Sequence, residues 1–161
     1  SKLMNQFNDM RFILITIIIC LYITPTKAEL FKPNPSIRPE KVISIHLLAL
    51  QKNSIPFNNA GITQTWEFAH PSNRQYTGPL EKFILMMYSP SYIIMLEHQF
   101  HKIIPVSQKD DTAFFFIELT DKPGNKFGFQ WTLQKVLTEG DYKNCWMTVG
   151  VSQPILLAKS T

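Results

Sequence analysis

The spacing of apolar side chains changes near His98, and this change predicts two halves with different secondary structure. Before His98, apolar residues recur every three or four positions, as they do on one face of a helix. After it, they alternate with polar residues, as in strands that bury one face. Helices followed by a run of strands are typical of the α+β class, in which helices pack against one face of an antiparallel sheet.

Three helices are predicted in the first half, over residues 39–52, 60–69 and 79–88. Pro39 and Pro79 stand at the first helical position, which proline favours because an N–H group would have no partner there. Asn58 or Asn59 is the expected N-cap of the second helix, because its side-chain oxygen can accept a hydrogen bond from the first turn.

A dense series of turn and helix-end signals occupies residues 66–98. Residues 72–74 are expected to form a single turn, because serine and asparagine side chains readily bond to the local backbone. We expect Thr77 or Gly78 to cap the third helix. Residues 92–96 predict one further short helical turn.

The second half predicts four strands, over residues 98–104, 112–120, 126–136 and 145–152. A hairpin turn over residues 121–125 joins the second strand to the third, and no element is assigned to the tail over residues 154–161. The third strand alternates most clearly, and one of its faces contains Phe127, Phe129, Trp131 and Leu133. We expect this apolar face to contact the helices. If the register were shifted by one residue, all four side chains would instead point toward solvent. The predicted fold is therefore α+β, with about three helices packed on a curved, mostly antiparallel four-stranded sheet.

Several short phrases of the chain carry a family resemblance: Phe68-Ala69, Pro71, Asn73-Arg74, Thr77-Gly78-Pro79-Leu80, Phe83, Ser89-Pro90, Tyr92, His98 and Cys145-Trp146-Met147-Thr148. The order of the elements, with the helix–turn–helix punctuation, resembles the nuclear transport factor two-like superfamily, also called ketosteroid-isomerase-like, and these phrases carry a closer match within it. A closer resemblance, over residues 38–152, is to the family called domain of unknown function 4864. The resemblance implies a cone-shaped fold that often follows a bacterial signal peptide. It implies no established reaction, so it transfers no catalytic residue to this chain.

The N-terminal segment has the pattern of a secretory signal peptide. An apolar run over residues 12–23 follows Arg11, and the small residues up to Ala28 predict cleavage after Ala28. The run is short for a membrane-spanning helix, which needs about 20 apolar residues. We therefore expect an exported protein, periplasmic or secreted if bacterial, and an uncleaved anchor is the alternative. The predicted parts of the chain are a signal peptide over 1–28, a linker over 29–38, one domain over 39–153 and a tail over 154–161.

Composition favours a packed domain and argues against a nucleic-acid partner. The chain is 45% hydrophobic and 17% charged, which is typical of a globular protein. Of the net charge of +4, residues 1–28 hold +2, from three basic residues and one acidic residue. The other basic residues are scattered singly rather than clustered, so we expect no nucleic-acid binding. Cys20 lies in the apolar run, so Cys145 would be the lone cysteine of the mature protein, and we expect it to be a small buried hydrophobe.

Aromatic side chains and one arginine supply the candidate ligand site. The residues predicted to bind a ligand are Trp66, Arg74, His98, Phe129 and Trp131. Large aromatic side chains either line an apolar pocket or fill a core, and both roles remain open at this point. Arg74 is expected to hold the loop before the third helix by binding backbone carbonyls, and the alternative is that it binds an anionic ligand.

No metal site is predicted, because no cluster of histidine, cysteine and acidic residues has the required spacing. His98 and His101 are three residues apart on a predicted strand, so their side chains are expected on opposite faces. Packing is the expected role of His98, and His46 is expected at the boundary of the core.

Two interpretations of function follow, with a third that depends on the N-terminus. The first is a non-enzymatic domain without cofactor or metal that binds a small apolar ligand or a partner protein, and a homodimer through the sheet is compatible with it. The second is an isomerase or dehydratase that uses a buried carboxylate, for which Glu67, Glu97 and Glu118 are the candidate acids, although a solvated position is expected for each. The third is an accessory subunit of a membrane complex held by residues 12–23, which would be the chain's one membrane contact.

Overall fold

The computed structural model of the chain describes residue 3 and residues 29–161. The predicted signal peptide, apart from Leu3, and its apolar run lie outside the described residues. Within the described part of the chain, no helix is long and apolar enough to cross a membrane. Export and the alternative membrane anchor both stay predictions.

Cleavage after Ala28 is the expected fate of the protein in its native host, because the apolar run and the small residues after it form a signal-peptidase pattern. An intact-mass measurement of the mature protein is expected to match a chain that begins at Glu29. A mature protein that keeps residues 10–28 would contradict this prediction and would favour the membrane-anchored alternative.

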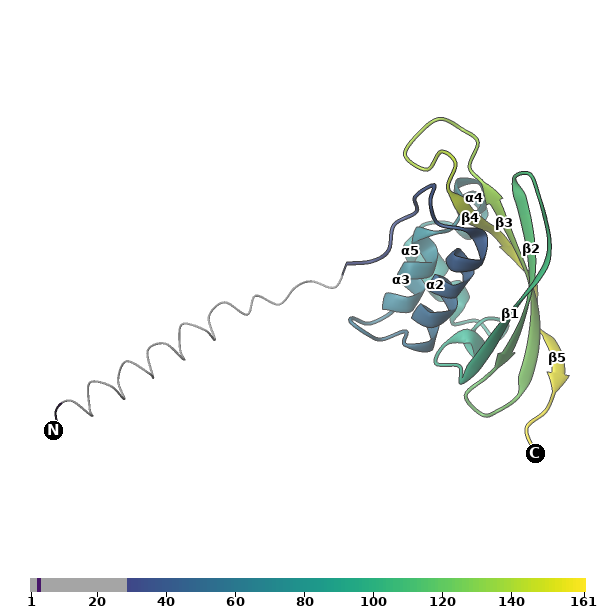
Figure 1. Cartoon of the computed structure of the whole chain (residues 1–161). Coiled ribbons are helices and arrows are strands. Elements are labelled where there is room, and N and C mark those ends of the chain that lie inside the picture. Colours follow the sequence, from purple (N-terminus) through teal and green to yellow (C-terminus); the bar gives the residue numbers. More distant parts are fainter. Residues whose placement is uncertain (1–2, 4–28) are drawn as a thin grey trace.

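The helices lie together on one side of the sheet, as Figure 1 shows. The helical elements of the described residues are α2 (Pro39–Gln51), α3 (Ala60–Glu67), α4 (Pro71–Thr77), α5 (Leu80–Met87) and the 3-10 helix η1 (Ile93–Met95). The helices α2, α3 and α5 correspond to the three predicted helices, and η1 to the short turn predicted over residues 92–96. Helices on an antiparallel sheet make the fold α+β, as predicted.

The sheet is antiparallel and open. Its strands, in the described part of the chain, are β1 (Phe100–Lys109), β2 (Thr112–Thr120), β3 (Lys126–Lys135), β4 (Trp146–Val151) and β5 (Ile155–Ala158). The first four are neighbours in chain order. Residues 131–135 of β3 pair with β4, and residues 126–128 of β3 pair with β5. The strands β4 and β5 therefore follow one another along the same edge of β3.

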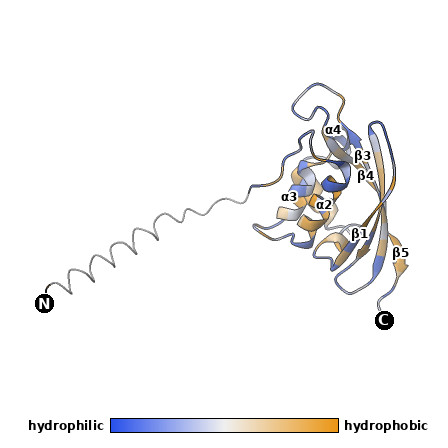
Figure 2. Ribbon diagram, in the orientation of Figure 1, coloured by the Kyte–Doolittle hydropathy of each residue, from blue (hydrophilic) through white to orange (hydrophobic). Residues whose placement is uncertain are grey.

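The strand β5 was not predicted, and it brings the described sheet to five strands rather than four. Its four residues are all apolar (Figure 2) and all exposed, so apolar and polar residues do not alternate along it as they do in the other strands. Pairing with the free end of β3, beyond the point where β4 ends, gives this segment its extended conformation. The contact is long-range, which explains why the local sequence did not reveal it.

The predicted register of the central strands is confirmed. The Trp131 side chain is 1% exposed, and Phe129 and Leu133 are fully buried with it on the helix side of β3. On β2, the buried residues Phe115 and Ile117 occupy the same face. These side chains contact the apolar faces of α2 and α3 and form one continuous core. Hence the alternating pattern predicted correctly which side of the sheet the helices cover.

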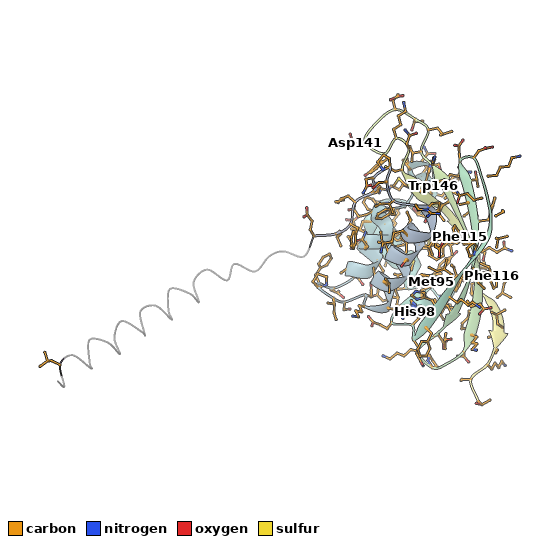
Figure 3. The ribbon with its side chains drawn as sticks, viewed as in Figure 1. Met95, His98, Phe115, Phe116, Asp141 and Trp146 are labelled. Atoms are coloured by element: carbon orange, nitrogen blue, oxygen red, sulfur yellow. The ribbon has the colours of Figure 1, made fainter. Side chains whose placement is uncertain are left out.

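The outer face of the sheet carries a smaller apolar area. Phe114 is 45% exposed, and Phe116 is half-buried because its ring lies over Gly128 of β3. A Cβ atom at Gly128 would come within 2.4 Å of the Phe116 Cζ atom, so the ring occupies the space that another residue would fill. Figure 3 shows Phe115 on the helix side of β2 and Phe116 on the opposite side. The homodimer through this face stays a prediction.

The predicted cap of the third helix is wrong, because Thr77 and Gly78 end the helix before it instead. Residues 71–77 form the helix α4 rather than a single turn, with Pro71 at its first position and the His70 ring accepting a hydrogen bond from the Ser72 N–H. The Thr77 hydroxyl donates to the Asn73 carbonyl inside α4, and Gly78, with φ of 75°, ends that helix. Pro79 therefore takes the position before α5, which has no side-chain cap. Asn59 occupies the position before α3, but its side chain makes no capping hydrogen bond either.

The first strand begins and ends later than predicted. The strand β1 starts at Phe100, because the backbone turns at Glu97 with φ of 58° and the pairing with β2 begins only at Phe100. It continues to Lys109 through a bulge between Pro105 and Ser107. Proline and a bulge suit an edge strand, where the outward backbone groups have no neighbouring strand. His98 thus precedes the strand.

Candidate functional site

A cavity of about 150 Å³ lies between the helices and the half of the sheet that contains β3 and β4. Its walls come from α2, α3, α4, α5, η1 and the two strands. The apolar part of the lining includes Leu50, Phe83, Met87, Met95, Trp131 and Val151. The polar side chains of the lining are Thr65, Asn73, Thr77, Tyr92 and Thr148. Among the described residues, no charged side chain lines the cavity.

The cavity has a buried floor and a half-buried mouth. Leu50, Trp131 and Thr148 form part of the floor, and each of them is buried. The half-buried lining residues belong to α4, α5, β4 and the segment that follows α5: Asn73, Thr77, Met86, Tyr92, Gly150 and Val151. The cavity therefore opens toward solvent between α4, α5 and β4.

The link between α3 and α4 is tied to β4, and this holds the mouth in place. The Thr148 N–H donates to the Phe68 carbonyl, and the His70 N–H donates to the Thr148 carbonyl, both at 2.8 Å. Ala69 forms a parallel bridge with Thr148 between these two bonds. Because Pro71 then starts α4 directly, the short helix begins at the edge of β4 and extends over the cavity.

Hydroxyl groups supply most of the polar character of the cavity. The Thr65 hydroxyl donates to the Gly61 carbonyl at 2.9 Å, and the Tyr92 hydroxyl donates to the Val151 carbonyl at 3.2 Å. The Trp131 indole N–H donates to the Thr148 Oγ1 atom at 3.0 Å. Burial raises the pKa of the Tyr92 hydroxyl, so the group stays protonated near neutral pH. The cavity thus presents neutral hydrogen-bonding groups on an apolar wall.

Of the five residues predicted to bind a ligand, the structure places Trp131 in the cavity lining and the other four elsewhere. Phe129 is fully buried in the core, on the same face of β3. Trp66 and Arg74 stack against one another, and His98 lies at the start of the sheet. The structure therefore does not bring the five together into one site.

Arg74 holds the end of α3. Its Nη2 atom donates to the Trp66 carbonyl at 3.0 Å and to the Glu67 carbonyl at 3.1 Å. Its guanidinium carbon lies 3.9 Å from the centre of the Trp66 ring and 5.6 Å from that of Tyr142. The last carbonyls of a helix lack partners within the helix and attract cations. The arginine supplies the partner of the Glu67 carbonyl and adds a second bond to the Trp66 carbonyl, which also accepts from the Ala69 N–H. This is the geometry expected of a bracing arginine.

His98 and His101 do not point to opposite faces, so that prediction is wrong. Their rings are in contact, with 2.8 Å between the His98 Nε2 atom and the His101 Nδ1 atom. The alternation of a strand does not apply to this pair, because His98 precedes β1. The His98 Nδ1–H donates to the Met95 carbonyl at 2.7 Å, which leaves its Nε2 atom as the acceptor from His101. Figure 3 shows Met95 and His98 close together below the helices.

His46 is fully buried rather than at the core boundary, which corrects the prediction for this residue. Its ring packs between Phe68 and Trp131, with ring centres 5.8 Å and 5.5 Å away. Neither ring nitrogen makes a hydrogen bond to a described residue. Burial lowers the pKa of His46 from 6.5 to about 3, so the ring is neutral near pH 7.

The candidate acids lie away from the cavity. Glu118 is exposed on the outer face of the sheet, and Glu97 is exposed in the turn before His98. The Glu67 carboxylate pairs with Lys32 at 2.9 Å. Cys145 is buried with Val136 and Met147, and burial raises the pKa of its thiol. Within the described residues, no group of three or more histidine, cysteine or acidic side chains has the arrangement of a metal site.

Comparison with known proteins gives no relative, because no family model, curated protein or solved structure matches the chain. The resemblance to the nuclear transport factor two-like superfamily, and the cone shape that it implies, therefore stay predictions. Sequence reasoning missed Tyr92 and Thr148 as members of the site. Both belong to phrases that carried the resemblance, and neither has a spacing pattern that links it to Trp131.

Proposed function

We propose that the domain binds a small, uncharged, mainly apolar molecule in this cavity and catalyses no reaction on it. The observation that carries the proposal is an apolar cavity of about 150 Å³ with a half-buried mouth. An engineered cavity of about 150 Å³, lined by leucine, isoleucine and phenylalanine, binds benzene or xenon. A ligand of about six to eight non-hydrogen atoms would therefore fit, and its apolar surface would leave water on binding.

The absence of charged groups in the described lining favours binding over catalysis. An isomerase or dehydratase needs a proton acceptor within hydrogen-bonding reach of its substrate. Glu67, Glu97 and Glu118 were the candidates, and none of them lines the cavity. The lining hydroxyls are neutral groups, and a neutral hydroxyl is a poor proton acceptor, so they serve better to orient a ligand than to remove a proton.

A variant whose larger side chain fills the cavity tests whether the ligand binds there. Ala69 is 3% exposed and lines it, so Ala69→Leu would place three more carbon atoms inside. We expect toluene to raise the melting temperature of the wild-type domain but not that of the variant. We also expect the unliganded variant to melt at or above the wild-type temperature, because filling a cavity restores lost packing contacts. Thermal unfolding followed by circular dichroism measures both effects.

The exposed residue Ala158 of β5 offers a matched control, because Ala158→Leu adds the same atoms on the surface. This variant is expected to keep the response to toluene. The proposed function would be overturned if toluene neither raised the melting temperature of the wild-type protein nor changed its NMR chemical shifts. An Ala69→Leu variant that still responds would place the binding elsewhere in the domain.

A further inference from the structure

The hydroxyl groups that line the cavity differ in what they can offer a ligand. Three of the four give their hydrogen to a backbone carbonyl: Thr65 to Gly61, Thr77 to Asn73 and Tyr92 to Val151. Each of these keeps acceptor lone pairs and has no hydrogen left to donate. Thr148 is different, because its oxygen accepts a hydrogen bond from the Trp131 indole N–H. Its hydroxyl hydrogen donates to no described residue.

The position of the Thr148 side chain is rigidly set. Its backbone N–H and carbonyl are both bonded to the link between α3 and α4, through Phe68 and His70. The indole that reaches its oxygen belongs to Trp131, which is 1% exposed and cannot move without opening the core. Thr148 itself is 5% exposed and lies on the floor of the cavity. The indole occupies one side of the oxygen, so the hydroxyl hydrogen must point in another direction.

We infer that Thr148 determines the ligand class by donating a hydrogen bond to an oxygen acceptor on the ligand. The ligand would be an uncharged ring compound of about six to eight non-hydrogen atoms, with a carbonyl or similar oxygen at its buried end. A buried donor favours such a ligand, because an acceptor that loses water needs a partner in the protein. A carboxylate is disfavoured, because the described lining contains no cation to pair with it. This inference rests on the proposed function and adds a polar requirement to it.

Two isosteric probes test the inference: cyclohexanone, which has a carbonyl oxygen, and methylenecyclohexane, which has a CH₂ group in its place. Thr148→Val removes the hydroxyl at nearly constant shape, and Thr148→Ser keeps it. We expect Thr148→Val to weaken cyclohexanone binding by about 3- to 10-fold, the effect of one neutral hydrogen bond. Methylenecyclohexane binding should stay within about twofold, because a hydrocarbon makes no hydrogen bond. Thr148→Ser should bind both probes as the wild type does, and cyclohexanecarboxylate should not bind.

A second measurement needs no variant, so its negative result can overturn the role of Thr148 even if Thr148→Val fails to fold. The infrared carbonyl stretch of cyclohexanone bound to the wild-type domain should lie below its value in hexane, because hydrogen bonding weakens the C=O bond. A stretch at the hexane value, or an equal effect of Thr148→Val on both probes, would overturn the role of Thr148 and leave the apolar site intact. Failure of both probes to bind the wild type would overturn the proposed function as well.

Discussion

Lowering the pH from 8 to 5 should cost the domain about 2 kcal/mol of unfolding free energy through His46 alone. The ring is fully buried between Phe68 and Trp131, and neither nitrogen bonds to a described residue. Protonation in place would put a charge in the core without a partner, which is why its pKa falls to about 3.

The two pKa values of His46, in the unfolded and the folded state, determine whether the domain gains or loses stability as the pH falls. In the unfolded chain His46 takes up a proton near pH 6.5, whereas in the folded domain it does so only near pH 3. The unfolded state therefore binds more protons between these values, so the stability is full above about pH 6.5 and falls as the pH drops. His98, whose pKa burial lowers to about 4, acts in the same direction.

The variant His46→Leu isolates this effect. We expect it to be as stable as the wild type or more stable at pH 8, because it replaces a buried polar ring without partners by an apolar side chain. Its loss of stability between pH 8 and pH 5 should be smaller by about 2 kcal/mol. Urea unfolding at several pH values measures both quantities.

A variant of the half-buried His70 is the control for the pH dependence. His70→Asn removes a half-buried histidine and keeps an oxygen that can accept from the Ser72 N–H, so most of the pH dependence should remain. If His46→Leu lost stability with pH as steeply as the wild type, the acid sensitivity would have another source and His46 would be solvated in solution.

Arg74→Ala should lower the stability of the unliganded domain by about 1.5–3 kcal/mol. The change removes the Nη2 hydrogen bonds to the Trp66 and Glu67 carbonyls and the stacking over the Trp66 ring. It also leaves the Glu67 carbonyl at the end of α3 without its partner, whereas the Trp66 carbonyl keeps its bond from the Ala69 N–H. The melting temperature should fall by about 5–10 °C for a domain of this size.

Arg74→Lys should recover only part of the loss, because an ammonium group cannot both bind two carbonyls and stack flat on an indole. Lys41→Ala, which removes an exposed cation from α2, is the control and should change stability by less than about 0.5 kcal/mol. An unchanged melting temperature for Arg74→Ala would show that the arginine braces nothing. The pair of Trp66 and Arg74 would then be the first place to look for an anionic ligand.

The elements that the sequence predicted best are those with long and regular patterns. Residues 112–120 form β2 as predicted, and β3 ends one residue before the predicted boundary. The helix α2 begins at Pro39 as predicted, because that proline and the apolar stripe after it act within one segment. Trp131 is the one predicted site residue that lines the cavity, and its burial followed from the same alternation.

The site itself could not be predicted, because its members come from segments that are distant in the sequence. Thr148 reaches the cavity through bonds to Phe68 and His70, which are nearly 80 residues away. No pattern in the residues near Thr148 predicts that the Trp131 indole N–H donates to its hydroxyl oxygen. The predicted faces of His98 and His101 were wrong for a related reason, since the start of β1 depends on its pairing with β2.

The sequence by itself determined the order of helices and strands, the face of each central strand that meets the helices, and the absence of a charge cluster. Hydrophobic periodicity and proline geometry act over a few residues, so they can be read from one segment at a time. The tertiary structure alone decided the burial of His46, the addition of β5, the extension of α4 and the existence of a cavity. These features depend on how well distant side chains fill the space between a helix layer and a twisted sheet, and packing of that kind has no local signal.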